Sequence, residues 1–248
     1  MISFEVLSIF PNLFQPYMDA SIMGRARAHN LYSLTTYDLR SWTHDAHHSV
    51  DDAPYGGGQG MLMKCEPFFE AFSEISSYRA EKPYIVMFSP CGKRFTQACA
   101  AELSHKKRVL FACGHYEGID ERVYQKADAI YSLGDYVLTG AELATLVVLD
   151  ATIRLIPGAL GDAQSAHDES FSDAGLLEYA QYTRPREVEG ARVPDVLLSG
   201  NHEAIKTWKR MNALERTARW RPDLLSSATL TDKEYDFVQN LTSHRKDM

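Results

Sequence analysis

Residues 108–123 read Arg-Val-Leu-Phe-Ala-Cys-Gly-His-Tyr-Glu-Gly-Ile-Asp-Glu-Arg-Val. The apolar run 108–113 predicts a buried strand, and the polar stretch after it predicts a tight loop and the first turn of a helix. Gly114 and Gly118 let the backbone approach a ligand or adopt a positive φ, while Tyr116 and Glu117 supply a flat face and an acceptor. Ligands of open α/β sheets bind at this kind of turn, so we expect a ligand site here.

The same pattern of strand, loop and helix occurs before and after this stretch. Strands are predicted at 84–89, 108–112 and 129–132, with helices at 95–105, 121–127 and 139–156. Two earlier strands are predicted at 2–10 and 31–37. This alternation favours one α/β domain with a mainly parallel sheet. The three loops that follow the later strands, at 89–93, 113–120 and 132–141, should then lie on one edge of the sheet.

The predicted helix 139–156 is apolar nearly all round, with Leu143, Val147 and Leu149 among its apolar residues. Such a helix is expected in the core or against another subunit. Arg154 near its end is a charge in an apolar setting, and it needs a partner.

The composition and the pattern of the N-terminal residues predict a globular protein of the cytoplasm. The chain has 248 residues, of which 45% are hydrophobic and 24% charged. Its apolar runs are far shorter than a membrane span, and no basic segment precedes an apolar core at the N-terminus. The four cysteines show neither Cys-x-x-Cys spacing nor neighbouring histidines at zinc-ligand distance, so no metal site is expected. The histidines at 44, 47 and 48 are interpreted as a polar surface loop.

The composition changes after residue 160. Residues 161–175 are small, polar and acidic, which predicts a flexible linker between a domain at 1–160 and a helical unit at 176–248. The whole chain carries a net charge of −7, which argues weakly against nucleic acid, but 202–222 carries six basic and two acidic residues, a net +4. A basic helix is usually a solvated face; it also fits RNA binding. The candidate RNA contacts at helical spacing are Lys206, Lys209, Arg210 and Arg216.

Several long motifs in one order resemble a known family. They are Asp-Asp-Ala-Pro-Tyr-Gly-Gly-Gly-Gln-Gly-Met-Leu-Met at 51–63, Ser-Pro-Cys-Gly at 89–92, the stretches 113–123 and 132–143, Leu-Ile-Pro-Gly at 155–158, Tyr-Thr-Arg-Pro at 182–185, and 193–202. Together they are similar to the bacterial tRNA (guanine-N1)-methyltransferases of the TrmD family, in the knotted SPOUT class. The resemblance spans nearly the whole chain.

The resemblance implies transfer of the methyl group of S-adenosylmethionine to N1 of the guanosine immediately 3′ of a tRNA anticodon. It also implies a trefoil knot around the cofactor, a homodimer that binds the anticodon arm, and a magnesium ion that leaves no signature in this sequence. The usual topology rules alone predict an ordinary doubly wound sheet. The positions that match cofactor contacts are Ser89, Pro90, Gly114, Tyr116, Glu117, Leu133, Gly134, Asp135, Tyr136, Val137, Leu138 and Gly140.

The reaction needs a base for the N1 proton and a cation for charge on O6. Arg154 matches the family's arginine. For the base, the sequence departs from the usual Asp-Ser-Phe: it reads Glu169-Ser170-Phe171, with Asp168 one residue earlier. A gapless alignment favours Glu169 over Asp168. Ala141 stands where glycine is common, and a positive φ there would strain the cofactor loop.

Two other functions compete with this one. The altered acid and Ala141 would also fit a catalytically weak tRNA-binding protein that keeps the fold. A nucleotide-dependent hydrolase or kinase is remote, because the glycine-rich stretch 56–60 lacks the Lys-Ser/Thr ending of a phosphate loop.

Overall fold

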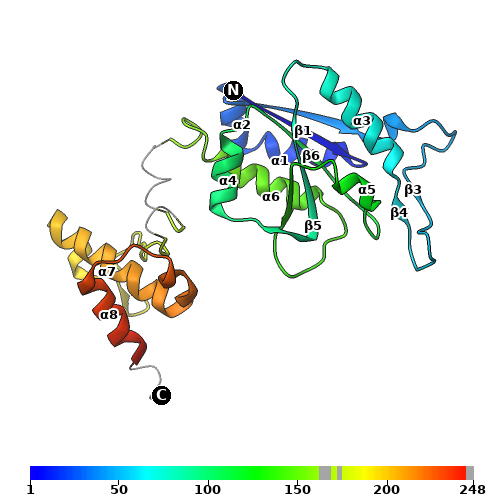
Figure 1. Cartoon of the computed structure of the whole chain (residues 1–248). Helices are drawn as coiled ribbons and strands as arrows, with labels where there is room; N and C mark the ends of the chain where they lie inside the picture. The colour runs from blue at the N-terminus through cyan, green and yellow to red at the C-terminus, as the bar shows by residue number, and fades with distance from the viewer. Residues whose placement is uncertain (162–168, 172–174, 244–248) are drawn as a thin grey trace. The chain divides into compact units, whose positions relative to one another are not determined.

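The computed structural model describes the chain except for residues 162–168, 172–174 and 244–248. The chain divides into two compact units, Met1–Ala163 and Gln164–Met248 (Figure 1). Each unit has its own hydrophobic core.

The first unit is built on a five-stranded sheet, and all its neighbouring strands run parallel. The order is β2-β1-β6-β5-β7. Its strands are β1 (Ile2–Ser8), β2 (Tyr32–Asp38), β5 (Tyr84–Arg94), β6 (Arg108–Ala112) and β7 (Ala129–Ser132). This confirms the predicted α/β class and parallel sheet. The trefoil knot stays a prediction.

Helices cover both faces of the sheet (Figure 1). One face carries α1 (Gln15–Met18), α2 (Ser21–Ala28), α4 (Gln97–Ser104) and α6 (Glu142–Ile153), and the other carries α3 (Cys65–Ser77) and α5 (Glu121–Tyr124). Successive side chains of a strand point to opposite faces of the sheet and so enter both cores. In β6, Val109 and Phe111 point to the first face and Leu110 to the second. The short elements of this unit are the 3₁₀ turns η1 (Pro11–Leu13) and η2 (Leu39–Trp42) and the ribbon of β3 (Asp51–Asp52) and β4 (Leu62–Met63).

Three details differ from the sequence prediction. Phe88 and Lys93 both pair with Tyr131, so the predicted loop 89–93 is an irregularity inside the longer strand β5. The sequence pattern did not predict the amphipathic helix α3. Helix α6 is shorter than the predicted 139–156, and it is not buried all round: Leu143 is 62% and Val147 52% exposed.

The second unit contains the predicted basic helix, which forms α7 (His202–Trp220). Helix α7 packs against α8 (Asp232–Ser243) around buried Leu214 and Val238. Asn201 caps α7 by accepting a hydrogen bond from the Ala204 backbone N–H, as its position before the helix predicts. The remaining elements are the hairpin of β8 (Glu187–Val188) and β9 (Ala191–Arg192), and the 3₁₀ turns η3 (Asp195–Leu198) and η4 (Pro222–Ser226).

Candidate functional site

A cavity of about 350 Å³ opens at the carboxyl edge of the sheet in the first unit. It lies within the usual size range of small-molecule sites, at its lower end. Most of its lining comes from three separate stretches, which coincide with the three predicted loops. The lining comprises Leu62, Phe88, Ser89, Pro90, the residues 114–119, Tyr124, the residues 131–134, the residues 136–141 and Ala144. Every predicted cofactor residue is among them except Asp135, which is exposed outside the lining.

The loops after β6 and β7 are joined to each other at the cavity. The Ala141 backbone N–H donates to the Gly114 carbonyl at 2.9 Å, and His115 and Gly140 form an antiparallel bridge. Ala141 has φ −89°, so alanine at this position carries no left-handed strain. The positive φ that would strain the cofactor loop therefore does not occur at this position.

The glycine-rich stretch holds the outer side of the loop after β6. The Glu117 backbone N–H donates to the Met61 carbonyl at 3.1 Å, and Met63 forms a parallel bridge with Ile119. Gly60 lies against the Glu117 side chain at a φ of +82°, so a residue with a Cβ would collide there. The stretch therefore supports the cavity wall.

Glycines expose backbone groups to the cavity. Gly114, Gly118, Gly134 and Gly140 all belong to its lining. A Cβ on Gly140 would overlap the Glu142 carboxylate and the His115 ring. Such a wall recognises a ligand by backbone N–H and C=O groups, which side-chain changes leave intact.

The charge of the cavity suits a cationic ligand. Glu117 is its one carboxylate, and no lysine or arginine occurs among the described lining residues. Tyr116 and Tyr136 add aromatic faces that attract cations. A polyphosphate would need basic side chains or a phosphate loop, so this lining argues against the nucleotide-dependent hydrolase or kinase.

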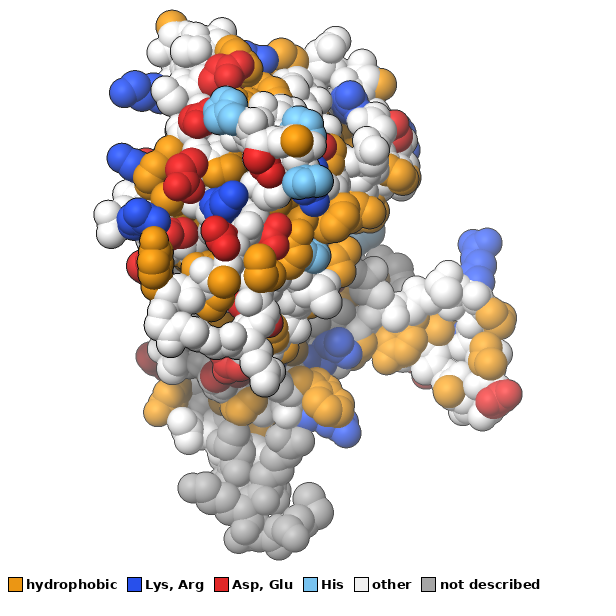
Figure 2. Space-filling view, turned by 90° about the vertical axis from the view of Figure 1, so that its right-hand side faces the viewer, with side chains coloured by type: hydrophobic (Ala, Val, Ile, Leu, Met, Phe, Trp, Pro, Cys, Tyr) orange, Lys and Arg blue, Asp and Glu red, His pale blue; other side chains and the backbone are white. Residues whose placement is uncertain are grey.

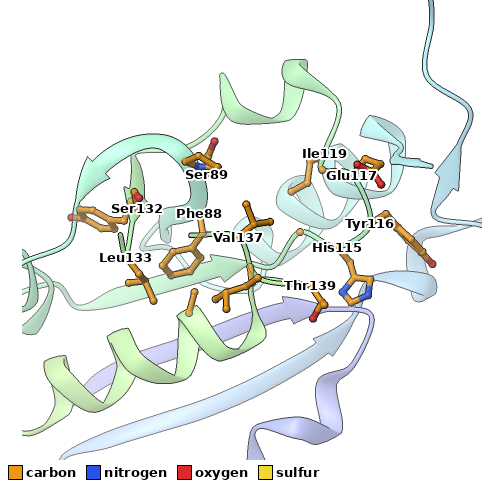
Figure 3. Close-up of a pocket in the computed structure, with 18 of the residues that line it drawn as sticks. Phe88, Ser89, His115, Tyr116, Glu117, Ile119, Ser132, Leu133, Val137 and Thr139 are labelled. Atoms are coloured by element: carbon orange, nitrogen blue, oxygen red, sulfur yellow. The ribbon is translucent and has the colours of Figure 1, made fainter. Parts of the chain in front are cut away.

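The two ends of the cavity differ in character. Figure 3 shows His115, Tyr116 and Glu117 toward one end and Phe88, Ser132 and Leu133 toward the other. Burial raises the pKa of Tyr124 and of Tyr131, so these two phenols of the lining stay protonated at neutral pH.

A buried polar cluster lies behind His115. Ser8 Oγ donates to Glu142 Oε1 at 2.7 Å, and Glu142 Oε2 lies 3.9 Å from His115 Nδ1. Burial, with the nearby Glu142 carboxylate as a second cause, raises the pKa of the Cys113 thiol, which therefore stays protonated. This cluster joins β1, the loop after β6 and the first turn of α6.

Arg154, one of the predicted catalytic residues, lies away from the cavity of its own chain. Arg154 follows α6 at the helix end opposite the cavity, about 15 Å along the axis from Ala144 at 1.5 Å per residue. Glu169 belongs to the second unit, where Ser170 Oγ accepts a hydrogen bond from the Glu178 N–H at 2.9 Å. Asp168 lies outside the described residues.

The four predicted RNA-contact residues all lie on α7 but differ in their surroundings. Lys206 is exposed, and the Lys209 ammonium lies 4.4 Å from the centre of the Tyr179 ring. Arg210 forms an ion pair with Glu234, and Arg216 donates to the Glu178 carbonyl at 3.0 Å. The two lysines are therefore the more available cations.

The remaining polar surface offers no metal cluster within the described ranges. No group of three or more His, Cys, Asp or Glu side chains that could hold an ion occurs there. His44, His47 and His48 are exposed, as predicted, and His44 pairs with Glu70. Figure 2 shows histidines among acidic and basic side chains on the face turned to the viewer. None of the helices in the described residues has both the length and the apolar character that a membrane crossing requires.

Sequence reasoning missed part of the lining. Phe88 and Tyr131 were assigned only to strands, and Leu62 only to a motif, because apolar residues at strand ends look like core. His115 lies in a predicted loop, but the sequence pattern predicts no role for it. The signal that would have found Phe88 and Tyr131 is their place directly before two of the predicted loops.

Comparisons with known proteins identify the family. The family described as "tRNA (Guanine-1)-methyltransferase TrmD" matches residues 2–227. A tRNA (guanine-N(1)-)-methyltransferase of Dictyoglomus turgidum is 46% identical over 241 residues, covering 97% of each chain. Proteins of the same name from Lacticaseibacillus paracasei and Syntrophotalea carbinolica are 49% and 48% identical, covering 91% and 96% of this chain and 88% and 96% of theirs. The chain therefore belongs to the tRNA (guanine-1)-methyltransferase TrmD family.

Proposed function

We propose that the protein methylates N1 of the guanosine immediately 3′ of the tRNA anticodon, with S-adenosylmethionine as methyl donor. The observation that carries the proposal is the cavity whose three lining stretches coincide with the family's cofactor motifs. The names of the relatives give the reaction class. The alternative of a catalytically weak RNA-binding protein loses one of its two arguments, because Ala141 has a negative φ.

The cavity fits S-adenosylmethionine by shape and by charge. The glycine-lined wall offers backbone donors and acceptors to a nucleoside, and Leu133 and Phe88 supply apolar contact for its base. Glu117 and the face of Tyr116 suit a ligand with a positive sulfonium. When bound, the cofactor supplies a methyl group activated by this sulfonium.

The protein's residues then accept one proton and stabilise one developing charge. Glu169, or Asp168 in its place, accepts the N1 proton as the methyl group arrives, so that the purine ends neutral. Arg154 stabilises the negative charge that spreads onto O6 during the transfer. The positive charge on sulfur disappears with the departing methyl, so a released proton balances the reaction.

We propose a homodimer because one chain leaves Arg154 far from its own cavity. Leu143, Val147 and Arg154 recur on one side of α6 at spacings of four and seven residues, and the two apolar side chains are exposed. In a pair whose two-fold axis crosses this stripe at right angles to the helix, the two α6 helices run antiparallel. Arg154 of the partner subunit would then lie toward the cavity end of α6.

The second unit is the proposed carrier of the base and of the tRNA contacts. Residues 176–248 would bind the anticodon arm through Lys206 and Lys209, with 161–175 as the linker to the cofactor domain at 1–160. Glu169 would approach the guanosine from this linker. A cytoplasmic location accords with a tRNA substrate and is part of the proposal.

A methyl-transfer assay tests the function directly. Purified protein is incubated with methyl-labelled S-adenosylmethionine and unmodified tRNA, and the methylated nucleoside is mapped by mass spectrometry. We expect N1-methylguanosine at the position 3′ of the anticodon, and none when this guanosine is replaced by adenosine. Omitting magnesium from the same assay tests the metal expectation. Intact cofactor binding without methyl transfer would instead support the weak RNA-binding protein.

A further inference from the structure

Ser170, the residue after the proposed base Glu169, is hydrogen-bonded within the second unit. Its Oγ accepts a hydrogen bond from the Glu178 backbone N–H at 2.9 Å. The next residue is tied as well, because the Phe171 backbone N–H donates to the Leu176 carbonyl at 3.0 Å. Leu176 is only 4% exposed and belongs to the core of this unit. The two hydrogen bonds therefore fix the backbone next to Glu169 to a segment that is anchored in the core.

That segment, residues 176–180, is held in turn by helix α7. Three side chains of the helix form hydrogen bonds with its backbone: Thr217 accepts from the Leu177 N–H at 2.9 Å, Arg216 donates to the Glu178 carbonyl at 3.0 Å, and Asn212 accepts from the Ala180 N–H at 2.7 Å. Thr217 is fully buried, where a polar group needs such a partner. The three side chains lie within two turns of one helix. The segment and α7 are therefore connected as one body.

Phe171 adds a contact with the end of the same helix. Its φ is +67°, a conformation that is rare for a bulky residue and that surrounding contacts must hold. The guanidinium carbon of Arg221, which follows the last residue of α7, lies 5.8 Å from the centre of the Phe171 ring, within the range of a cation–π contact. The backbone directly after Glu169 is therefore fixed at both Ser170 and Phe171.

The same helix carries the proposed tRNA contacts. Lys206 and Lys209 lie on α7, two to three turns before Thr217. A phosphate bound by these lysines would thus be connected to Glu169 through α7, the segment 176–180 and the Ser170 hydroxyl. The geometry of this connection matters for a reaction, because a displacement of about 1 Å at a reacting group can lower a rate about a hundredfold.

We propose that Ser170 is a positioning residue: by tying the chain beside Glu169 to α7, it lets the binding of the anticodon arm place the base at the target guanosine. The inference rests on the proposed function, because it assumes that Glu169, or Asp168 beside it, accepts the N1 proton. Ser170 itself takes no proton. Its loss should slow methyl transfer and leave the affinity for tRNA unchanged, because Lys206 and Lys209 are untouched.

Single-turnover methylation by the full-length protein, at saturating S-adenosylmethionine and tRNA, tests the proposal. Ser170→Ala removes the acceptor of the Glu178 N–H and should lower the rate about tenfold, with a dissociation constant for tRNA within about twofold of the wild type. Ser170→Thr keeps the hydroxyl and should keep most of the rate. Ser226→Ala is the matched control: it removes an exposed hydroxyl of the same unit, which donates to the Asp223 carbonyl at 2.8 Å, and it should behave as wild type.

A double variant separates positioning of the base from a general loss of structure. Of Glu169→Gln and Asp168→Asn, the slower variant lacks the base, and adding Ser170→Ala to it should lower the rate no further, because no base remains to be placed. A further fall in this double variant, a wild-type rate in Ser170→Ala or in both acid variants, or a Ser170→Thr as slow as Ser170→Ala overturns the inference and leaves the function intact. Absence of methyl transfer by the wild type contradicts the proposed function itself.

Discussion

Arg210 Nε lies 2.6 Å from Glu234 Oε1, and this ion pair joins α7 to α8. The same guanidinium donates to the Thr229 carbonyl at 2.9 Å. Arg210 therefore holds the second unit together, although its sequence position suggested an RNA contact. Lys206 on the same helix is exposed. The basic helix thus contains a cation held in an ion pair and a cation exposed to solvent, and substitutions can test the two separately.

The double variant Lys206→Ala/Lys209→Ala should weaken tRNA binding and leave the fold intact. Removing two phosphate-facing charges should reduce the slope of log K against log salt by about 2. Fluorescence anisotropy with labelled tRNA at several salt concentrations measures this. Lys82→Ala, an exposed lysine of the first unit, is the control and should behave as wild type. An unchanged tRNA affinity in the double variant would refute the RNA surface.

The Arg210–Glu234 pair should make the second unit sensitive to acid. Hydrogen bonding to Arg210 lowers the pKa of Glu234 from 4.5 to about 2. A carboxylate whose pKa is lower when folded stabilises the fold above its unfolded pKa and loses this contribution as the pH falls toward 2. We expect a loss of roughly 1–2 kcal/mol, since solvent screens the arginine, whose side chain is 34% exposed. Urea unfolding at about pH 7 and about pH 3 should show a smaller difference in Glu234→Gln than in wild type.

Gly140→Ala should abolish cofactor binding while the protein still folds. The added methyl would overlap the Glu142 carboxylate and the His115 ring, and so force the two joined loops apart. We expect no measurable binding, which means a loss of affinity well beyond tenfold, or more than about 1.4 kcal/mol. Gly161→Ala is the matched control, because a Cβ there meets nothing within 4 Å. Calorimetry and circular dichroism check binding and fold; wild-type affinity in Gly140→Ala would show that the loops tolerate separation.

The local sequence pattern predicted the strands of the sheet well, because a buried strand shows as an uninterrupted run of apolar residues. The strand 108–112 is apolar throughout, and its predicted and observed bounds agree. Helix α3 was missed although Pro67 lies in its first turn, where proline is tolerated. The pairing of His115 with Glu142 depends on how two distant loops meet, and no short-range pattern contains it. The position of Arg154 likewise follows from the length of α6, which separates it from the cavity in its own chain.

Glu169→Gln should lower kcat by about 10²–10⁴ without changing cofactor affinity, if Glu169 is the general base. Asp168→Asn should then stay close to wild type. The rate of Glu169→Gln should also rise with pH, since the N1 proton leaves more readily in alkali. Single-turnover methylation across pH measures both effects. A dead Asp168→Asn beside an active Glu169→Gln would assign the base to Asp168.

Mixing two inactive variants should restore activity if Arg154 acts on the cavity of the partner subunit. Arg154→Ala keeps an intact cavity, and Gly140→Ala keeps the arginine. In a mixed dimer, one site combines the intact cavity of the first variant with the Arg154 of the second, while the other site lacks both. Random reassociation of equal amounts makes half of the dimers mixed, each with one complete site, so about a quarter of wild-type activity is expected. If Arg154 served the cavity of its own chain, neither site of the mixed dimer would be complete. The mixture would then stay as inactive as its components, and the antiparallel contact along α6 would be wrong.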